Sequence, residues 1–202
     1  IHPFYAATAR QFRAAGRPLL GSAPVGVEGT AAWLEAMGEL LGTDCASIDA
    51  AISTQKSAIR AALDNNPIDA KITLSGYEGS ELLVARLLIE SGADVAYVGS
   101  ACPKTEFSAV DAEWLEACGV SVKFRASLED DLIAMEAFKP DLVIGTTPIV
   151  QKAKERSIPS LYFTNLISAR PLMGAAGAGS VAQVINSALA NQPRMIAMEE
   201  FF

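Results

Sequence analysis

The stretch DLVIGTTPIVQKAKERSIPSLYFT, residues 141 to 164, contains the repeating unit from which the fold of this chain can be recognised. It begins with an apolar run that ends at Gly145, continues as a short amphipathic segment, and passes through Ile158-Pro159 into a second apolar run. Short apolar runs that flank a helical pattern are typical of parallel strands covered on both faces. The stretch therefore predicts a strand, a short helix and a second strand, with the turn Gly-Thr-Thr-Pro after the first strand.

The same alternation extends back to about residue 71. Strands are predicted at residues 71–75, 95–99, 120–124, 141–145 and 160–164, and helices at 80–91, 108–118, 127–138 and 180–189. Gly92 and Gly119 end two of these helices, and Ser127 with Asp130 resembles a capping box. Strands that alternate with helices predict an α/β fold with a doubly wound, Rossmann-like parallel sheet of about five strands and right-handed crossovers.

The residues before this sheet have a helical pattern. Helices are predicted at residues 5–15, 30–41 and 44–63, with a turn at 24–29 after which Thr30 caps the second helix. We expect residues 1–70 to be a helical segment that leads in from a missing N-terminal domain, and residues 71–202 to be the Rossmann-like α/β domain. The start Ile1-His2-Pro3 is unusual, so we expect the chain to be cut from a longer polypeptide.

Composition excludes several classes of function. The chain has 202 residues and a net charge of −7, which disfavours binding to nucleic acid. No apolar run approaches the roughly 20 residues that span a bilayer, and no leader pattern is present, so we expect a cytoplasmic protein without a transmembrane segment. Three scattered cysteines and a single histidine, His2, disfavour a disulfide framework, a histidine metal site and a catalytic triad.

The strand order predicts where a ligand would bind. In open α/β sheets, ligands bind beyond the carboxyl ends of the strands, where the strand order reverses. With the order 3-2-1-4-5, the reversal lies between the first and fourth strands, whose exit loops are Gly76–Ser80 and Gly145–Pro148. The candidate substrate-binding residues in these loops are Gly76, Tyr77, Glu78, Thr146 and Thr147. The alternative for the threonines is that they only cap the helix that begins at Pro148.

Known phosphate and nucleophile motifs are weak in this sequence. No Gly-Lys dipeptide occurs, so no P-loop is present. Residues 177–182 match GxGxxA, but they follow the last strand after a long loop, and packing of a helix start explains the glycines better than a dinucleotide. Cys102 follows the second strand without a neighbouring cysteine, so a small buried residue is favoured over a nucleophile or metal ligand.

The segment 165–177 is predicted to be a long loop at the rim of the sheet. Long connections in compact domains are usually functional. Asn165 and Arg170 are further candidate substrate-binding residues, since the Arg170 cation can meet a carboxylate on a ligand. The alternative is that Arg170 pairs with an acidic residue on the surface.

Longer strings in the sequence resemble a known family. They are PDLVIGTTPIVQKAKERSIPSLYF (140–163), RPLMGAAGAGS (170–180), RPLLGSAPVGVEGTAAWLEAMG (17–38) and LGTDCASIDAAI (41–52). They resemble the C-terminal domain of the nitrogenase component 1 family over nearly the whole chain. Within that family, they are most similar to the branch that reduces chlorophyllide in bacteriochlorophyll synthesis.

The resemblance implies an oxidoreductase whose catalytic component is a heterotetramer of two related chains. It implies that a separate ATP-driven iron–sulfur reductase supplies electrons and that the C7=C8 double bond of the chlorin ring is reduced. It also implies a 4Fe-4S cluster held by cysteines outside this chain, because Cys45, Cys102 and Cys118 do not match the cluster ligands. We therefore expect no cofactor and no metal ligand in these 202 residues, and no activity from them alone.

One departure from the family concerns Met173. In nitrogenase the corresponding loop carries a histidine that binds the metal cofactor, and a thioether is a weak ligand for iron. The resemblance therefore implies an organic tetrapyrrole, with Leu172 and Met173 offering it an apolar surface. No catalytic residue is assigned, and the proton donor is open between Glu78, Arg170, water and the propionate of the substrate. The alternatives are a protochlorophyllide-reducing or nitrogenase paralogue, or a non-catalytic α/β module that binds a corrinoid or small ligand.

Overall fold

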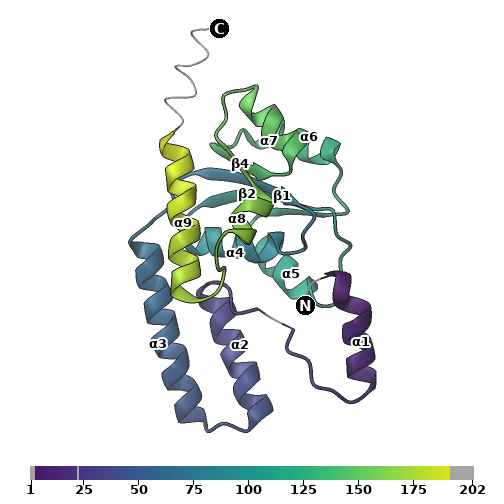
Figure 1. Ribbon diagram of the computed structural model, residues 1–202, viewed down its shortest axis with the longest axis vertical. Coiled ribbons are helices and arrows are strands. Elements are labelled where there is room, and N and C mark those ends of the chain that lie inside the picture. The colour runs from purple at the N-terminus through teal and green to yellow at the C-terminus, as the bar shows by residue number, and fades with distance from the viewer. Residues whose placement is uncertain (1–2, 22, 192–202) are drawn as a thin grey trace.

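The computed structural model describes residues 3–21 and 23–191, which form a parallel sheet and its surrounding helices (Figure 1). The strands are β1 (Lys71–Gly76), β2 (Asp94–Ser100), β3 (Ser121–Phe124), β4 (Leu142–Gly145) and β5 (Ser160–Tyr162). Their order is β3-β2-β1-β4-β5, and every pairing is parallel. The predicted doubly wound α/β fold and its strand order are confirmed.

Helices cover both faces of this sheet (Figure 1). They are the 3-10 helix η1 (Pro3–Tyr5) and the α-helices α1 (Ala6–Ala14), α2 (Gly26–Leu41), α3 (Cys45–Asp64), α4 (Glu81–Glu90), α5 (Ala109–Ala117), α6 (Leu128–Phe138), α7 (Thr147–Lys154), α8 (Phe163–Ser168) and α9 (Gly174–Ala190). Helices α6 and α7 pack on one face of the sheet, whereas α4 covers the other, where α3 and α9 complete the core. The predicted capping box at Ser127 and Asp130 is present at the start of α6. The division of the chain at residue 70 stays a prediction.

The two faces of the sheet have very different cores. The large core contains the fully buried Leu74 and Ile144 and reaches outward to Leu63 of α3 and Ile185 of α9. The core under α6 and α7 is small, and its buried apolar members are Met135, Val143, Ile149 and Ala153. Because successive residues of a strand point to opposite faces, the same strands supply both cores.

Helix α2 begins earlier than the sequence predicts. The prediction of a turn at residues 24–29 and a cap at Thr30 is wrong, since α2 begins at Gly26 and the Thr30 hydroxyl donates to the Gly26 carbonyl within it. The first amides of α2 are instead capped by the Glu90 carboxylate, which accepts from Val27 N and Glu28 N. An acceptor from the end of α4 satisfies this helix start, so no local cap residue is needed.

The segment after β5 is also different from its prediction. The long loop expected at residues 165–177 contains the end of α8, and α9 begins at Gly174 rather than at residue 180. Phe163 and Leu166 are buried, which fixes α8 against the sheet. The GxGxxA match lies inside α9, where a Cβ on Gly177 would be 2.4 Å from the Leu172 carbonyl carbon. Close packing therefore explains this glycine, and a dinucleotide loop is not formed.

Within residues 3–21 and 23–191, no helix combines the length and apolar character that crossing a membrane requires.

Candidate functional site

A crevice of about 380 Å³ lies at the carboxyl ends of β1, β4 and β5, where the strand order reverses. It is lined by Tyr77, Gly145, Thr146, Thr147, Pro148, Tyr162, Thr164 and Asn165. Four of the predicted substrate-binding residues are therefore brought together here: Tyr77, Thr146, Thr147 and Asn165. Hydroxyl and amide groups dominate this lining, so the crevice suits a ligand with polar groups.

The two threonines do not cap α7 through their side chains. Thr146 occupies the N-cap position of α7, but its side chain makes no capping hydrogen bond, and Pro148 is the second residue of the helix rather than the first. The interpretation of both threonines as simple caps is therefore wrong. Among the described residues, neither threonine hydroxyl has a hydrogen-bond partner, which leaves both available to a ligand in the crevice.

The loop after β1 is held by Glu81, which no sequence motif indicated. Glu81 is fully buried at the start of α4, and its Oε1 accepts from Glu78 N at 2.8 Å and from Gly79 N at 3.1 Å. Its Oε2 accepts from Ser100 Oγ at 2.9 Å. A buried carboxylate with three donors fixes the loop that carries Tyr77. Its only local signal is an acidic residue in the first turn of α4, immediately before an apolar run.

Glu78 links the loops at two ends of the crevice. Its Oε1 accepts a hydrogen bond of 3.1 Å from Thr164 Oγ1, which lines the crevice from the other side. Gly76 ends β1 beneath this loop, on the face occupied by Glu81 and Phe163. The structure therefore places Glu78 at the rim and Gly76 behind it, and neither is in the lining.

The remaining predicted residues lie elsewhere. Met173 is 57% exposed and lines a separate hollow of about 600 Å³ with residues of α2 and α3, whereas Leu172 packs against the large core. Arg170 is partly exposed and has no ion pair or hydrogen bond within the part of the chain that the structure describes. The predicted set is thus divided between the crevice and the loop before α9. The alternative for Arg170, an ion pair with a surface acid, is not formed among the described residues.

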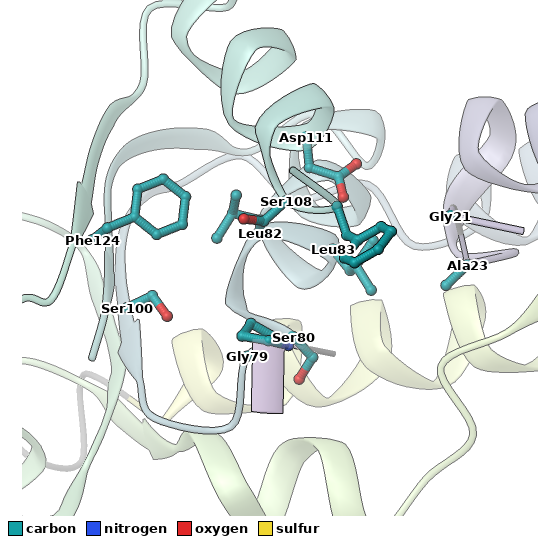
Figure 2. A pocket seen from close by; sticks show the side chains of 12 residues that line it. Gly21, Ala23, Gly79, Ser80, Leu82, Leu83, Ser100, Ser108, Asp111 and Phe124 are labelled. Atoms are coloured by element: carbon teal, nitrogen blue, oxygen red, sulfur yellow. The ribbon is translucent and has the colours of Figure 1, made fainter. Parts of the chain in front are cut away.

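A second hollow, of about 210 Å³, lies on the α4–α5 side of the carboxyl edge. Figure 2 shows Ser80, Ser100 and Ser108 around it, with Asp111 and Phe124 on its walls. No sequence pattern indicated this hollow. Its serines come from three separate loops and strands, which no local motif connects.

Cys102 follows β2 and is buried. It is 2% exposed, and its Sγ donates to the Tyr77 carbonyl at 3.6 Å. Burial, and then the neighbouring Glu81 carboxylate, raise the pKa of the Cys102 thiol, so it stays protonated at neutral pH. The expectation of a small buried residue is confirmed.

An iron–sulfur cluster does not fit the described residues. Cys45 begins α3 and Cys118 follows the end of α5, both of them exposed, and Cys102 is buried after β2. Across residues 3–21 and 23–191, no group of three or more cysteine, histidine or acidic side chains is placed to hold a metal ion.

Comparisons with known proteins give matches that extend along most of the chain. The model of the family "Nitrogenase component 1 type Oxidoreductase" matches residues 1–190. The chain is 66% identical over 202 residues to the chlorophyllide reductase 52.5 kDa chain of Cereibacter sphaeroides, and 63% identical to that of Rhodobacter capsulatus. Both matches cover all of this chain, which spans 40% and 41% of the two relatives.

Matches at lower identity also cover most of this chain and less than half of the matched protein. A light-independent protochlorophyllide reductase subunit of Methylobacterium sp. (strain 4-46) is 28% identical over 165 residues, which are 79% of this chain and 32% of that protein. A solved structure described as nitrogenase Cp1 at pH 6.5 superposes with a TM-score of 0.60 at 24% identity, over 84% of this chain and 39% of that one. At this identity, the superposition shows a shared fold.

Proposed function

The chain belongs to the nitrogenase component 1 type oxidoreductase family, and on this basis we propose that it is part of the catalytic component of a chlorophyllide a reductase. The observation that carries the proposal is the 66% identity to a chlorophyllide reductase chain along all 202 residues. The 28% identity to a protochlorophyllide reductase subunit is much lower and makes that paralogue the second candidate.

The proposed reaction adds two electrons and two protons to the C7=C8 double bond of the chlorin ring. The electrons come from an ATP-driven iron–sulfur reductase, and a related second subunit completes a heterotetramer in the cytoplasm. A 4Fe-4S cluster would be held by other parts of this assembly, because the described residues offer no ligand set for it. We expect the 202 residues alone to be inactive.

The residues of this chain would bind and orient the pigment. A crevice of about 380 Å³ is within the range of small-molecule sites, and its free hydroxyls can accept or donate hydrogen bonds to polar groups at the edge of the ring. Glu81 and Glu78 would keep the loops around the crevice in place, because their carboxylates already hold the loop amides and Thr164. Arg170, Leu172 and Met173 would contact the pigment from the neighbouring loop.

A turnover assay with two pigments tests this proposal. The full-length parent chain is combined without oxygen with its second subunit, the reductase component, ATP and chlorophyllide a, and the red absorption band is followed. We expect that band to be replaced by a near-infrared bacteriochlorin band. Consumption of protochlorophyllide instead would favour the paralogue. No reaction with either pigment, in a preparation whose cluster is intact, would favour a non-catalytic ligand-binding module.

A further inference from the structure

A hollow of about 360 Å³ lies where α1, α4 and α5 meet the segment that leads into α2. Its walls are largely apolar, with contributions from Val25, Leu83, Phe107 and Val110. It adjoins the smaller hollow of Figure 2, because both are lined by Leu83 and Phe107, and it shares no lining residue with the crevice. Its volume is within the range of small-molecule sites, about 300–1,000 Å³, so it is large enough for a ligand of its own.

The hollow is lined by a largely buried guanidinium group, that of Arg86 on α4. The Arg86 side chain is 14% exposed, and its Nη1 donates to Asp111 Oδ1 at 2.5 Å. Its guanidinium carbon lies 4.7 Å from the centre of the Trp114 ring. A guanidinium has five N–H donors, and the described residues offer the remaining donors of Arg86 no acceptor. Buried donors are nearly always hydrogen-bonded, so this group favours a ligand that accepts hydrogen bonds.

A second guanidinium group reaches the same hollow from α1. The guanidinium carbon of Arg13 lies 5.2 Å from the centre of the Phe107 ring. Within residues 3–21 and 23–191, Arg13 makes no ion pair and no hydrogen bond, so all of its donors are available. Guanidinium groups bind carboxylates through charge-assisted hydrogen bonds, which are stronger than neutral ones. The hollow therefore combines apolar walls with two groups suited to a carboxylate.

The acids that line the hollow are already paired. Nε and Nη2 of Arg10 donate to the two carboxylate oxygens of Glu106 at 2.8 and 3.2 Å, and these hydrogen bonds lower the pKa of the Glu106 carboxyl to about 2. Asp111 is paired with Arg86. The lining acids and arginines together with Arg10 contain three guanidinium groups and two carboxylates, which leaves one positive charge in excess. This balance favours a ligand with a single negative charge.

We propose that this hollow binds a small organic monocarboxylate, with its carboxylate held by Arg13 and Arg86 and its apolar body against Leu83 and Phe107. The site is separate from the crevice and does not depend on the proposed function. Helix α1 is attached to the segment before α5 by the exposed pair Arg10–Glu106, and exposed pairs contribute little stability. A bound carboxylate would connect α1 to α4, so the ligand should also stabilise α1.

Titration of the full-length parent chain with 4-(trifluoromethyl)benzoate, followed by fluorine NMR, tests the class of ligand. We expect saturable binding with a Kd of about 1 mM or lower. The amide 4-(trifluoromethyl)benzamide has the same apolar body without the charge, and it should bind at least about tenfold more weakly. Inorganic phosphate has charge without an apolar body and should not displace the benzoate at equal concentration. No saturable benzoate binding, equal binding of the amide, or displacement by phosphate would overturn the proposal.

Variants of the two arginines test the carboxylate contacts. Arg13→Met removes one guanidinium from an exposed position, and we expect benzoate binding to weaken about tenfold. Arg86→Lys keeps a charge beside Asp111 but loses the planar fork, and it should weaken binding by a similar factor. Arg60→Met is the control, since Arg60 is exposed on α3 and does not line the hollow. Unchanged binding in both variants would contradict the assigned contacts.

A filled hollow and the behaviour of α1 complete the test. Ala32 is exposed on α2 and lines the hollow, so Ala32→Phe should occupy the space and abolish benzoate binding. Ala137→Phe places the same ring at an exposed position of α6 and should leave binding unchanged. Hydrogen exchange of the α1 amides should slow in saturating benzoate. Full binding by Ala32→Phe, or α1 exchange that benzoate does not alter, would show that the ligand binds elsewhere.

Discussion

The two faces of the sheet use neighbouring residues of the same strands for different purposes. On the α4 face, Leu74 and Val98 are fully buried in a continuous apolar core. On the α6 face, the adjacent positions Ser75 and Tyr97 carry hydroxyl groups that surround Asp131. This contrast indicates that one face holds the fold together, while the other can tolerate polar groups close to the crevice. The predictions below test this division.

The largest effect is expected in the apolar core. Leu74→Ala removes a fully buried side chain, and we expect it to lower the free energy of unfolding by about 4 kcal/mol because a cavity is left behind. Ser75→Ala, one residue along the same strand, should cost about 1 kcal/mol through its lost hydrogen bond. Urea unfolding followed by tryptophan fluorescence measures both. Equal losses would contradict the division between the faces.

The next largest effect is expected where a polar group enters the α4 face. Glu81→Ala leaves the amides of Glu78 and Gly79 and the Ser100 hydroxyl without their acceptor, which should cost about 3 kcal/mol of unfolding free energy. Glu81→Gln keeps one acceptor oxygen and should lose less. Hydrogen exchange at the Glu78 and Gly79 amides should accelerate in both variants, and most in Glu81→Ala. Unchanged exchange would show that Glu81 does not hold the loop.

A smaller, pH-dependent effect is expected on the α6 face. Folding raises the pKa of Asp131, mainly through burial, so the protonated form favours the folded state. This contribution is fully present below the unfolded pKa and is lost as the pH rises through the folded pKa. The stability of Asp131→Asn relative to wild type should therefore improve as the pH is raised, and the two are compared at about pH 4, near the ordinary carboxyl pKa, and at about pH 8. Unfolding free energies at the two pH values check this, and a constant difference would contradict it.

The smallest effect is expected at the start of α2. Glu90→Gln replaces the carboxylate that accepts from Val27 N and Glu28 N, and loss of its charge near a helix N-terminus should cost about 0.5 kcal/mol. Glu39→Gln, an exposed position near the other end of the same helix, is the control and should not destabilise the protein. Thermal unfolding midpoints compare the two, and an equal midpoint for both variants would argue against capping by Glu90.

The sequence predicts the features of this fold that depend on local pattern. Alternating apolar runs and glycine-ended helices predicted the five strands, and the strand order then located the crevice between the loops of Tyr77 and Thr146. Contacts between distant residues were not predictable in this way. Glu81 and Glu90 look like ordinary helix acids, and their roles depend on loops and helices brought to them by the fold.

Two further features of the structure were also not predicted from the sequence. Asp131 reads as one of three acids in the first turn of α6, and only the packing of α6 on β2 shows that it is buried against Tyr97. The small residues from Gly174 to Gly179 read as a loop, because glycine has low helix propensity in isolation. They are the first turns of α9 instead, and Gly177 among them lies too close to the Leu172 backbone for a side chain.

The placement of the pigment can be tested by the KM for chlorophyllide a of the full-length complex carrying Thr146→Val and Thr147→Val. These changes keep the shape of the crevice lining and remove its two free hydroxyls, so we expect KM to rise about tenfold, the effect of roughly 1.4 kcal/mol in binding. Thr43→Val is the control, since Thr43 is exposed between α2 and α3 and lines neither the crevice nor the hollow that contains Met173. An unchanged KM in the double variant, or an equal rise in the control, would contradict the binding of the pigment at this crevice.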